Sequence, residues 1–362
     1  MNPAWRPELA DLPERPGVYL FRNAKNAVLY VGKALNLRRR IASYFHRRRQ
    51  QPPKLRRMIA RARALTIHQT GSELEALLLE SRLIKQEAPP YNQLATAYIP
   101  LPFVKLALRE PFPRLLITRE WTPDGSHYLG PFPRFEIAAV VWAALQRLFP
   151  LRTCDTPIQP GVFPQPCEAF QVRKCAAPCV GGDTALAYHR HVDELLALLA
   201  QGRGAIVQRL REERQRAADA MFFERARHLH TLLAALDEAT IGRPLALLPV
   251  ALRNIVVLFE RSPPYTHEIV CIRHGLFAGR LVNGGRLIDR RTLDAFLTRC
   301  YVNPDHAPRR GEAVADELRI VAGWLHRTRG RALWAYLHPW TTSTAAVDTV
   351  MHALPTRWMH AQ

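Results

Sequence analysis

A short stretch near the N-terminus combines tyrosine hydroxyls with a dense positive charge. Segments 17–19 (GVY) and 30–32 (YVG) each carry one tyrosine. From Lys33 to Arg63 the chain has 12 lysines or arginines and no aspartate or glutamate. A solvated basic face normally includes acidic residues, because like charges repel one another. Phosphate groups are therefore the ligands that this stretch is expected to bind.

The whole chain is strongly basic. Its 362 residues carry a formal net charge of +20, which exceeds what solubility requires and indicates a polyanionic partner, nucleic acid ahead of an anionic membrane. No window of eighteen apolar residues exists, and residues 1–16 have no apolar core. We therefore expect neither a membrane span nor a signal peptide, and a cytoplasmic location.

The elements around the tyrosines predict a small domain. Residues 17–22 and 28–31 have the β-branched and aromatic content of two strands, and the polar segment between them predicts a hairpin. Residues 36–44 favour a basic helix, and residues 64–70 alternate as a strand. We assign residues 1–98 to an N-terminal domain in which a small antiparallel sheet is flanked by helices.

A single carboxylate interrupts an otherwise apolar helix. Ser72 and Glu75 form a capping box that opens a helix to about Glu87. Glu80 lies among leucines on this helix, so its side chain is expected to be partly buried. A buried carboxylate requires a cation, a metal ion or a proton. Two interpretations follow: a salt bridge to one of the many arginines, or a metal ligand at the floor of a basic cleft.

Four of the six cysteines are clustered in a proline-rich segment. Cys154, Cys167, Cys175 and Cys179 lie within 26 residues in the pattern C-x12-C-x7-C-x3-C. Four thiolates can bind zinc or an iron–sulfur cluster, and the C-x2-C pairing typical of zinc sites is absent. Unligated thiols are the third interpretation. The other two cysteines lie in apolar surroundings and are expected to be core thiols.

The remaining sequence predicts three further regions. Residues 99–183 form a middle region of mixed structure that contains the cysteines, and residues 184–240 form a helical region whose spacing predicts a helical hairpin. Residues 241–362 have strand-like runs followed by helices, which predict a small α/β domain. The fold class is thus multidomain, α+β or α/β.

The N-terminal motifs carry a family resemblance. The triplets GVY and YVG, the segment GKALNLRRRIASYF and the segment GSELEALLLESRLIKQEAPPYN together resemble the motifs of GIY-YIG nucleases. More specifically, residues 12–285 are similar to the N-terminal half of the UvrC/Cho excision-repair family, without its RNase H-like and helix-hairpin-helix domains. By this resemblance the active-site residues are Tyr19, Tyr30, Lys33, Arg40, Tyr44, Glu80 and Asn92.

The resemblance also implies roles for these residues. Glu80 binds a single Mg²⁺ or Mn²⁺, and Tyr30, acidified by the nearby Lys33, accepts a proton from the attacking water. Tyr19 helps to hold that water, and Arg40 contacts the scissile phosphate through its planar fork. The four clustered cysteines correspond to those associated with a [4Fe–4S] cluster in the family, with Zn²⁺ as the alternative.

Contacts to DNA and to a partner protein are expected elsewhere. The DNA-binding residues are predicted to be Arg38, Arg39, Arg47, Arg48, Lys54, Arg56 and Arg57. Segment 217–236 resembles a degraded UVR motif, the hairpin by which UvrC docks to UvrB, and the partner-binding residues are predicted to be Phe222, Phe223, Glu224 and Arg227. Ordinary packing of an amphipathic helical hairpin is the alternative explanation for this segment.

The resemblance implies an endonuclease that makes one metal-dependent nick in damaged double-stranded DNA. We expect the nick on the 3′ side of the lesion, after UvrA and UvrB have marked the site. Two other interpretations are a stand-alone GIY-YIG nuclease of restriction or mobile-element type, and a non-catalytic DNA-binding repair accessory.

Overall fold

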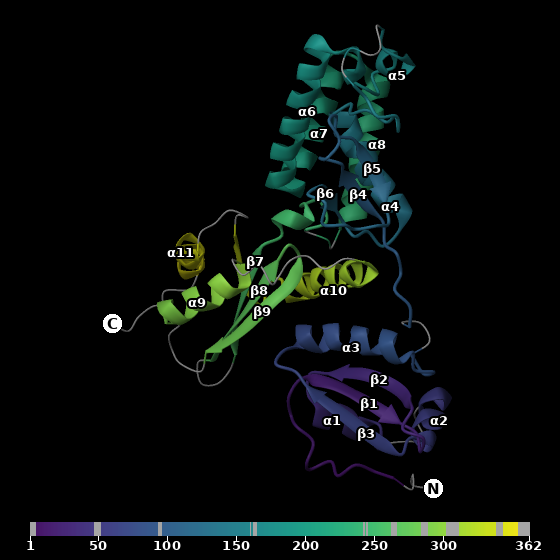
Figure 1. The fold of residues 1–362 in the computed structure, drawn as a ribbon, viewed down its shortest axis with the longest axis vertical. Coiled ribbons are helices and arrows are strands. Elements are labelled where there is room, and N and C mark those ends of the chain that lie inside the picture. The colour runs from purple at the N-terminus through teal and green to yellow at the C-terminus, as the bar shows by residue number, and fades with distance from the viewer. Residues whose placement is uncertain are drawn as a thin grey trace. The chain divides into compact units, whose positions relative to one another are not determined.

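The computed structural model divides the chain into two compact units, Met1–Ile99 and Pro100–Gln362, which are described separately below (Figure 1). The structure describes residues 5–46, 52–92, 96–159, 161, 165–241, 243, 245–261, 266–283, 289–301, 311–337 and 343–353.

The first unit contains one antiparallel sheet and three helices. Its strands are β1 (Gly17–Arg22), β2 (Val28–Ala34) and β3 (Ala64–Gln69), in the order β2-β1-β3. Its helices are α1 (Leu37–Ser43), α2 (Pro53–Arg61) and α3 (Glu73–Glu87). The prediction of a small antiparallel sheet flanked by helices is confirmed.

The alternation of side chains along β1 explains why helices cover both faces of this sheet. Val18 and Leu20 are buried in one apolar cluster with Ile84 of α3. Tyr19 and Phe21 point to the opposite face, into a cluster that includes residues of α1 and α2. Successive strand residues face opposite sides, so β1 is buried on both and reads as a continuous apolar run.

Side-chain caps fix where two of the helices begin. Asn36 accepts a hydrogen bond from the Arg39 amide at 2.8 Å and starts α1 directly after the YVG triplet. Ser72 accepts a hydrogen bond from the Glu75 amide at 3.2 Å and starts α3, which confirms the capping box. These two caps position the basic helix and the Glu80 helix relative to the sheet.

The second unit begins with a sheet and a helical group that share one apolar core. The strands β4 (Phe103–Leu106), β5 (Leu115–Thr118) and β6 (His127–Leu129) pair in the order β5-β4-β6. The helices are α4 (Phe135–Leu148), α5 (Glu168–Gln171), α6 (Gly182–Gln201), α7 (Arg203–Asp219) and α8 (Phe223–Thr240), with a 3₁₀ turn at Pro178–Val180. The helical region therefore has three helices rather than one hairpin, because Gly202 at φ 79° ends α6.

The same unit ends in a second sheet with helices. The strands β7 (Ile255–Arg261), β8 (Thr266–Arg273), β9 (Leu276–Asn283) and β10 (Leu333–Tyr336) pair antiparallel in the order β10-β7-β8-β9. The helices are α9 (Arg290–Tyr301), α10 (Glu312–Thr328) and α11 (Ser343–Ala353), and a 3₁₀ turn at Val250–Leu252 precedes β7. Cys271 and Cys300 are buried core thiols, as expected. Within the described residues, no helix is long and apolar enough to cross a membrane.

Candidate active site

The tyrosines of the two triplets pack together because a glycine leaves room for them. Tyr19 on β1 lies opposite Gly32 on β2 in the strand register. A Cβ atom at Gly32 would lie 2.4 Å from Tyr19 Oη and 2.7 Å from Tyr30 Cε1, closer than non-bonded atoms approach. The YVG glycine is therefore a steric requirement of the two rings.

A network of hydroxyl groups joins the sheet to α1. Tyr19 Oη lies 2.6 Å from Tyr44 Oη, and Arg40 Nε donates to Tyr19 Oη at 3.2 Å. The Arg40 guanidinium also lies over the Tyr44 ring, 5.2 Å from its centroid. Tyr30 is hydrogen-bonded to Tyr44, which extends the network to β2. Four of the predicted site residues thus form one connected group.

Burial keeps these hydroxyl groups protonated at neutral pH. Tyr19 is fully buried, and desolvation followed by its proximity to Tyr30 raises its pKa to about 12. Burial and the neighbouring Tyr19 likewise raise the pKa of Tyr44. The pKa of the half-buried Tyr30 is raised to about 12 by desolvation, then by Tyr44 and the Glu80 carboxylate. Tyr30 is the least buried of the three and the one nearest to a carboxylate.

Glu80 approaches the same strand from α3. Its Oε1 accepts a hydrogen bond from the Lys33 backbone amide at 2.9 Å. Its side chain is half-buried, as the helix pattern predicted, and burial raises the pKa of the carboxyl, against the Lys33 amide and the charges of Lys33 and Arg40. No salt bridge to Glu80 occurs among the described residues. A desolvated carboxylate with this environment fits a divalent cation, which would stabilise its ionised form.

The role expected for Lys33 is not what the structure shows. Lys33 Nζ lies 3.6 Å from Glu73 Oε1 and forms an ion pair with it. The cation that lowers the pKa of Tyr30 is Arg40, and its effect is outweighed by burial, Tyr44 and Glu80. The expectation that Lys33 acidifies Tyr30 is therefore wrong for this arrangement. Lys33 instead contributes its backbone amide to Glu80.

Asn92 holds the edge of β2. Its Oδ1 accepts from the Val31 amide and its Nδ2 donates to the Val31 carbonyl, both at 2.9 Å. The amide group thereby pairs with the strand as a neighbouring backbone would, between Tyr30 and Gly32. Because both ends of the amide are used, Asn92 positions the YVG triplet rather than reaching outward.

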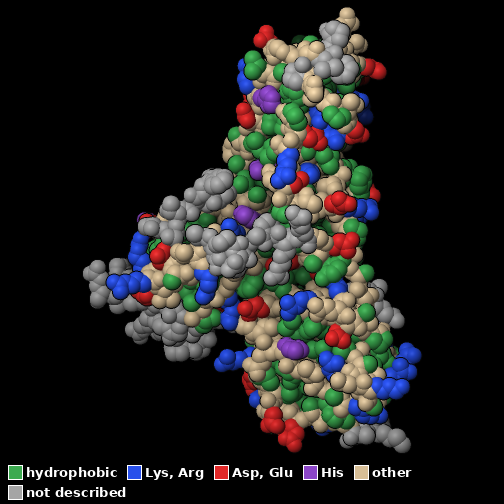
Figure 2. Space-filling model, viewed as in Figure 1, with side chains coloured by type: hydrophobic (Ala, Val, Ile, Leu, Met, Phe, Trp, Pro, Cys, Tyr) green, Lys and Arg blue, Asp and Glu red, His purple; other side chains and the backbone are tan. Residues whose placement is uncertain are grey.

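The basic residues divide into engaged and exposed groups. Arg38 ties the N-terminal segment to α1, because it donates to the carbonyls of Leu12 and Ala10 and pairs with Glu14 at 2.6 Å. This role replaces the phosphate contact expected of it. The exposed cations of the set are Arg39, Lys54, Arg56 and Arg57, while Arg47 and Arg48 lie outside the described residues. Figure 2 shows lysine and arginine side chains along the edge of the first unit that carries α2.

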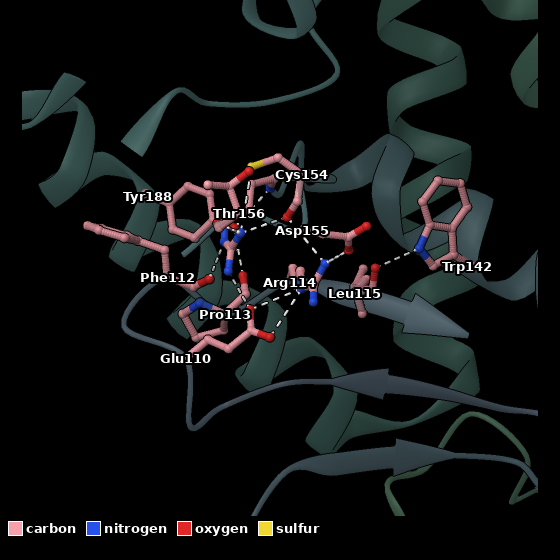
Figure 3. A network of polar contacts seen from close by, with 11 residues as sticks. Glu110, Phe112, Pro113, Arg114, Leu115, Trp142, Cys154, Asp155, Thr156 and Tyr188 are labelled. Carbon is pink, nitrogen blue, oxygen red and sulfur yellow. Dashed lines mark hydrogen bonds and ion pairs between the residues drawn. The ribbon is translucent and has the colours of Figure 1, made fainter. Parts of the chain in front are cut away.

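The loop that carries the first clustered cysteine is held by two arginines that the sequence reading did not single out. Arg152 is 3% exposed, and it donates to the carbonyls of Phe112 and Cys154 and pairs with Glu110. Arg114 also pairs with Glu110 and donates to the Cys154 carbonyl and to Asp155 (Figure 3). The signal was Arg152 itself, a charged residue in an otherwise apolar run two positions before the cysteine.

The four clustered thiols share one neighbourhood without forming a closed site. The thiols of Cys154, Cys167 and Cys179 all influence the pKa of Cys175, which burial raises. The Ala177 amide donates to Cys175 Sγ at 3.3 Å. In the part of the chain that the structure describes, no three His, Cys, Asp or Glu side chains are arranged to hold a metal ion. The arrangement seen is thus not a preformed cluster site.

The predicted partner-binding residues lie at the turn between α7 and α8. Phe222 and Phe223 are 61% and 69% exposed, and Glu224 and Arg227 are also exposed. This exposure is unusual for phenylalanine and leaves an apolar surface at the end of the helix pair.

Comparison with known families agrees with this geometry. Residues 15–93 match the family model of the UvrC-like GIY-YIG domain. The first unit is thus a GIY-YIG nuclease domain. Residues 101–198 match the UvrC/Cho excinuclease middle domain. In these two domains the chain belongs to the UvrC/Cho family.

Full-length relatives extend the similarity over most of the chain. The UvrABC system protein C of Moorella thermoacetica is 33% identical over 336 residues, which covers 89% of this chain and 53% of that protein. The UvrABC system protein C of Symbiobacterium thermophilum is 31% identical over 330 residues, covering 89% and 52%. The chain therefore spans about half the length of these relatives.

A solved structure matches the first unit. The N-terminal endonuclease domain of UvrC from Thermotoga maritima, with magnesium bound, is 39% identical, and the comparison covers 23% of this chain and 90% of that chain with a TM-score of 0.22.

Proposed function

We propose that this chain is a metal-dependent DNA endonuclease of nucleotide excision repair, which nicks the damaged strand on the 3′ side of a lesion together with UvrA and UvrB. The observation that carries the proposal is the convergence on β2 of the Tyr19–Tyr44–Arg40 network from one side and the Glu80 carboxylate from the other. Two domain-family matches support it.

Glu80 is the residue that would hold the divalent cation. When bound, such a cation acidifies a water and stabilises the negative charge that develops on the phosphate. Glu80 is suited to this task because its ionised form is desolvated and has no salt-bridge partner among the described residues. The Lys33 amide keeps one carboxylate oxygen directed at the strand. Glutamate oxygens are ligands that magnesium and manganese accept.

Tyr30 is the proposed proton acceptor. It lies on the same strand as the Lys33 amide that holds Glu80, and its hydroxyl is the least buried of the three. The Glu80 charge contributes to its raised pKa, so a cation that neutralises this charge would lower the pKa toward the working range. Tyr44 and Tyr19 orient the Tyr30 hydroxyl through the hydrogen-bonded network.

Arg40 is the proposed phosphate ligand. Its Nε is used by Tyr19, which fixes the guanidinium plane and leaves the two terminal nitrogens as donors. The exposed Arg39, Lys54, Arg56 and Arg57 would bind flanking phosphates, which gives affinity without sequence preference.

The cysteine segment is proposed as a second, structural site that binds a [4Fe–4S] cluster, with zinc as the alternative. Support comes from four thiols within one electrostatic neighbourhood and from the rigid anchoring of the Cys154 loop. Binding would require the thiols to close in from the arrangement seen. Iron content and absorbance near about 400 nm of anaerobically purified protein distinguish the two metals.

Partner docking is proposed at the α7–α8 turn, through Phe222, Phe223, Glu224 and Arg227, with UvrB as the partner. The support is the exposure of two adjacent phenylalanines. A repair nuclease acting with UvrA and UvrB on bacterial DNA would work in the cytoplasm.

The test is a nicking assay on a duplex that carries one bulky adduct, with magnesium and with or without UvrA and UvrB. The proposal predicts one nick, 3′ of the adduct, that depends on the two partners. Partner-independent cutting of undamaged duplex would instead indicate a stand-alone GIY-YIG nuclease. DNA binding with no nick under any condition would indicate a non-catalytic accessory.

A further inference from the structure

A pocket of about 460 Å³ lies where the cysteine segment meets the turn between α7 and α8. It is lined by Arg173, Met221, Phe222, Phe223, Glu224 and Arg225. Five of these residues come from the turn and the start of α8, whereas Arg173 lies between two of the clustered cysteines. The pocket is therefore built by two segments that are far apart in the sequence.

The turn presents its apolar side chains in a fixed conformation. Met221 has φ 59°, and the amides of Met221 and Phe222 donate back to the carbonyls of Ala218 and Ala217, which closes the end of α7. Met221 is 76% exposed, although a left-handed conformation is disfavoured for a residue with a long side chain. Strained, exposed apolar residues of this kind are typical of binding sites.

The opposite wall is also held in place. The Arg173 amide donates to the Phe170 carbonyl at 2.9 Å, and the Lys174 amide donates to the Ala169 carbonyl at 2.8 Å. Gln146 of α4 donates to the Lys174 carbonyl at 3.1 Å. These bonds fix the backbone from which the Arg173 side chain reaches the pocket.

Positive charge is in excess around the pocket. Arg147 lies near Arg225 and Arg173, and these neighbours lower its pKa after burial has done so. The buried Nε atoms of Arg147 and Arg225 have no hydrogen-bond partner among the described residues. The nearby Glu213 is already shared, because it pairs with Arg216 at 3.0 Å and with Arg225 at 3.4 Å. Donor groups of the arginines are therefore available to an acidic ligand.

We infer that this pocket receives an acidic segment of the docking partner, which places an apolar side chain against the turn and a carboxylate against the arginines. The inference rests on the proposed docking at this turn and adds its chemistry. It also makes Arg173 a specificity-determining residue, so that the cysteine segment forms part of the docking surface.

The lining favours a protein segment over a nucleic acid strand. Methionine, phenylalanine and arginine are the residues enriched in protein interfaces. Glu224 lines the pocket and Glu213 lies behind it, and both would repel a phosphodiester. A peptide carboxylate can pair with one arginine, whereas a strand places a charge at every nucleotide.

The test measures UvrB binding to the full chain and to three variants at two salt concentrations. Arg173→Gln and Phe223→Ala should each weaken binding about tenfold, the scale of a single interface anchor, and only Arg173→Gln should reduce the salt dependence. Arg190→Gln, an exposed arginine on α6, is the matched control and should bind as the parent does. Both test side chains are exposed, so the fold should persist.

Three results would overturn the inference. Unchanged binding by Arg173→Gln, with loss in Phe223→Ala, would restrict docking to the turn alone. A labelled single-stranded oligonucleotide that binds the parent but not the Phe223→Ala variant would make the pocket a strand-binding site. Absence of UvrB binding by the parent would remove the docking proposal, and nicking of the adduct duplex, measured in the same preparations, would still report on the nuclease.

Discussion

Replacing Gly32 by alanine tests whether the tyrosine network depends on the YVG glycine. The added methyl group would lie 2.4 Å from Tyr19 Oη, 2.6 Å from Tyr19 Cζ and 2.7 Å from Tyr30 Cε1. Tyr19 is fully buried and cannot swing into solvent, so the two rings must separate. Separation would lengthen the 2.6 Å contact between Tyr19 and Tyr44.

The magnitude follows from two contributions. Overpacking a buried site typically costs about 1–3 kcal/mol. The broken hydrogen bond between Tyr19 and Tyr44 adds about 1 kcal/mol. The expected loss of about 2–4 kcal/mol is smaller than the total stability typical of a domain, about 5–15 kcal/mol, so the first unit should remain folded.

Hydrogen exchange measured by mass spectrometry reports this loss locally. Peptides covering β1 and β2 should exchange roughly 30 to 700 times faster in Gly32→Ala than in the parent. Nicking should fall because Tyr19 and Tyr30 move. Gly204→Ala is the control, since its Cβ would meet open space within α7 and should stabilise that helix slightly. Parent-like exchange and nicking in Gly32→Ala would refute the steric argument.

Three further predictions concern the same unit. Arg40→Lys should slow single-turnover nicking about 10- to 100-fold because it loses the planar fork held by Tyr19, and a rate within about threefold of the parent would contradict the phosphate role. The pKa of Tyr30 near 12 means that its ionised form is scarce at neutral pH and grows about tenfold per pH unit, so the logarithm of the rate should rise with a slope of about 1 between about pH 6.5 and 8.5. A plateau across that range would point to another base. The double variant Arg56→Gln, Arg57→Gln should lower the salt dependence of DNA binding by about two counterions, and an unchanged slope would place DNA elsewhere.

The local features of the first unit could be predicted from sequence. Strand content, the capping box at Ser72 and the partial burial of Glu80 are set by neighbouring residues and by helical periodicity. They were predicted correctly because such rules act within one element. The connected group of Tyr19, Tyr44 and Arg40 followed from the family resemblance.

Features that depend on long-range contacts were missed. Asn92 clamps Val31 across 61 residues, which no local pattern indicates. The direction of the Tyr30 pKa depends on burial and on which cation lies nearest, and Lys33 is taken by Glu73. Arg152 and Arg114 anchor the Cys154 loop through residues about forty positions away. Helix α11 was not predicted, because its packing on β10 and α9 determines it more than its own sequence does.

Glu80→Gln tests the central claim most directly. The amide keeps the shape of the side chain and can still accept the Lys33 amide hydrogen, while the charge that would hold the cation is removed. With magnesium, UvrA, UvrB and an adduct duplex, the parent should make one nick 3′ of the lesion, and Glu80→Gln should bind DNA with the same salt dependence but make no nick. Magnesium-dependent nicking by Glu80→Gln at the parental rate would contradict the account.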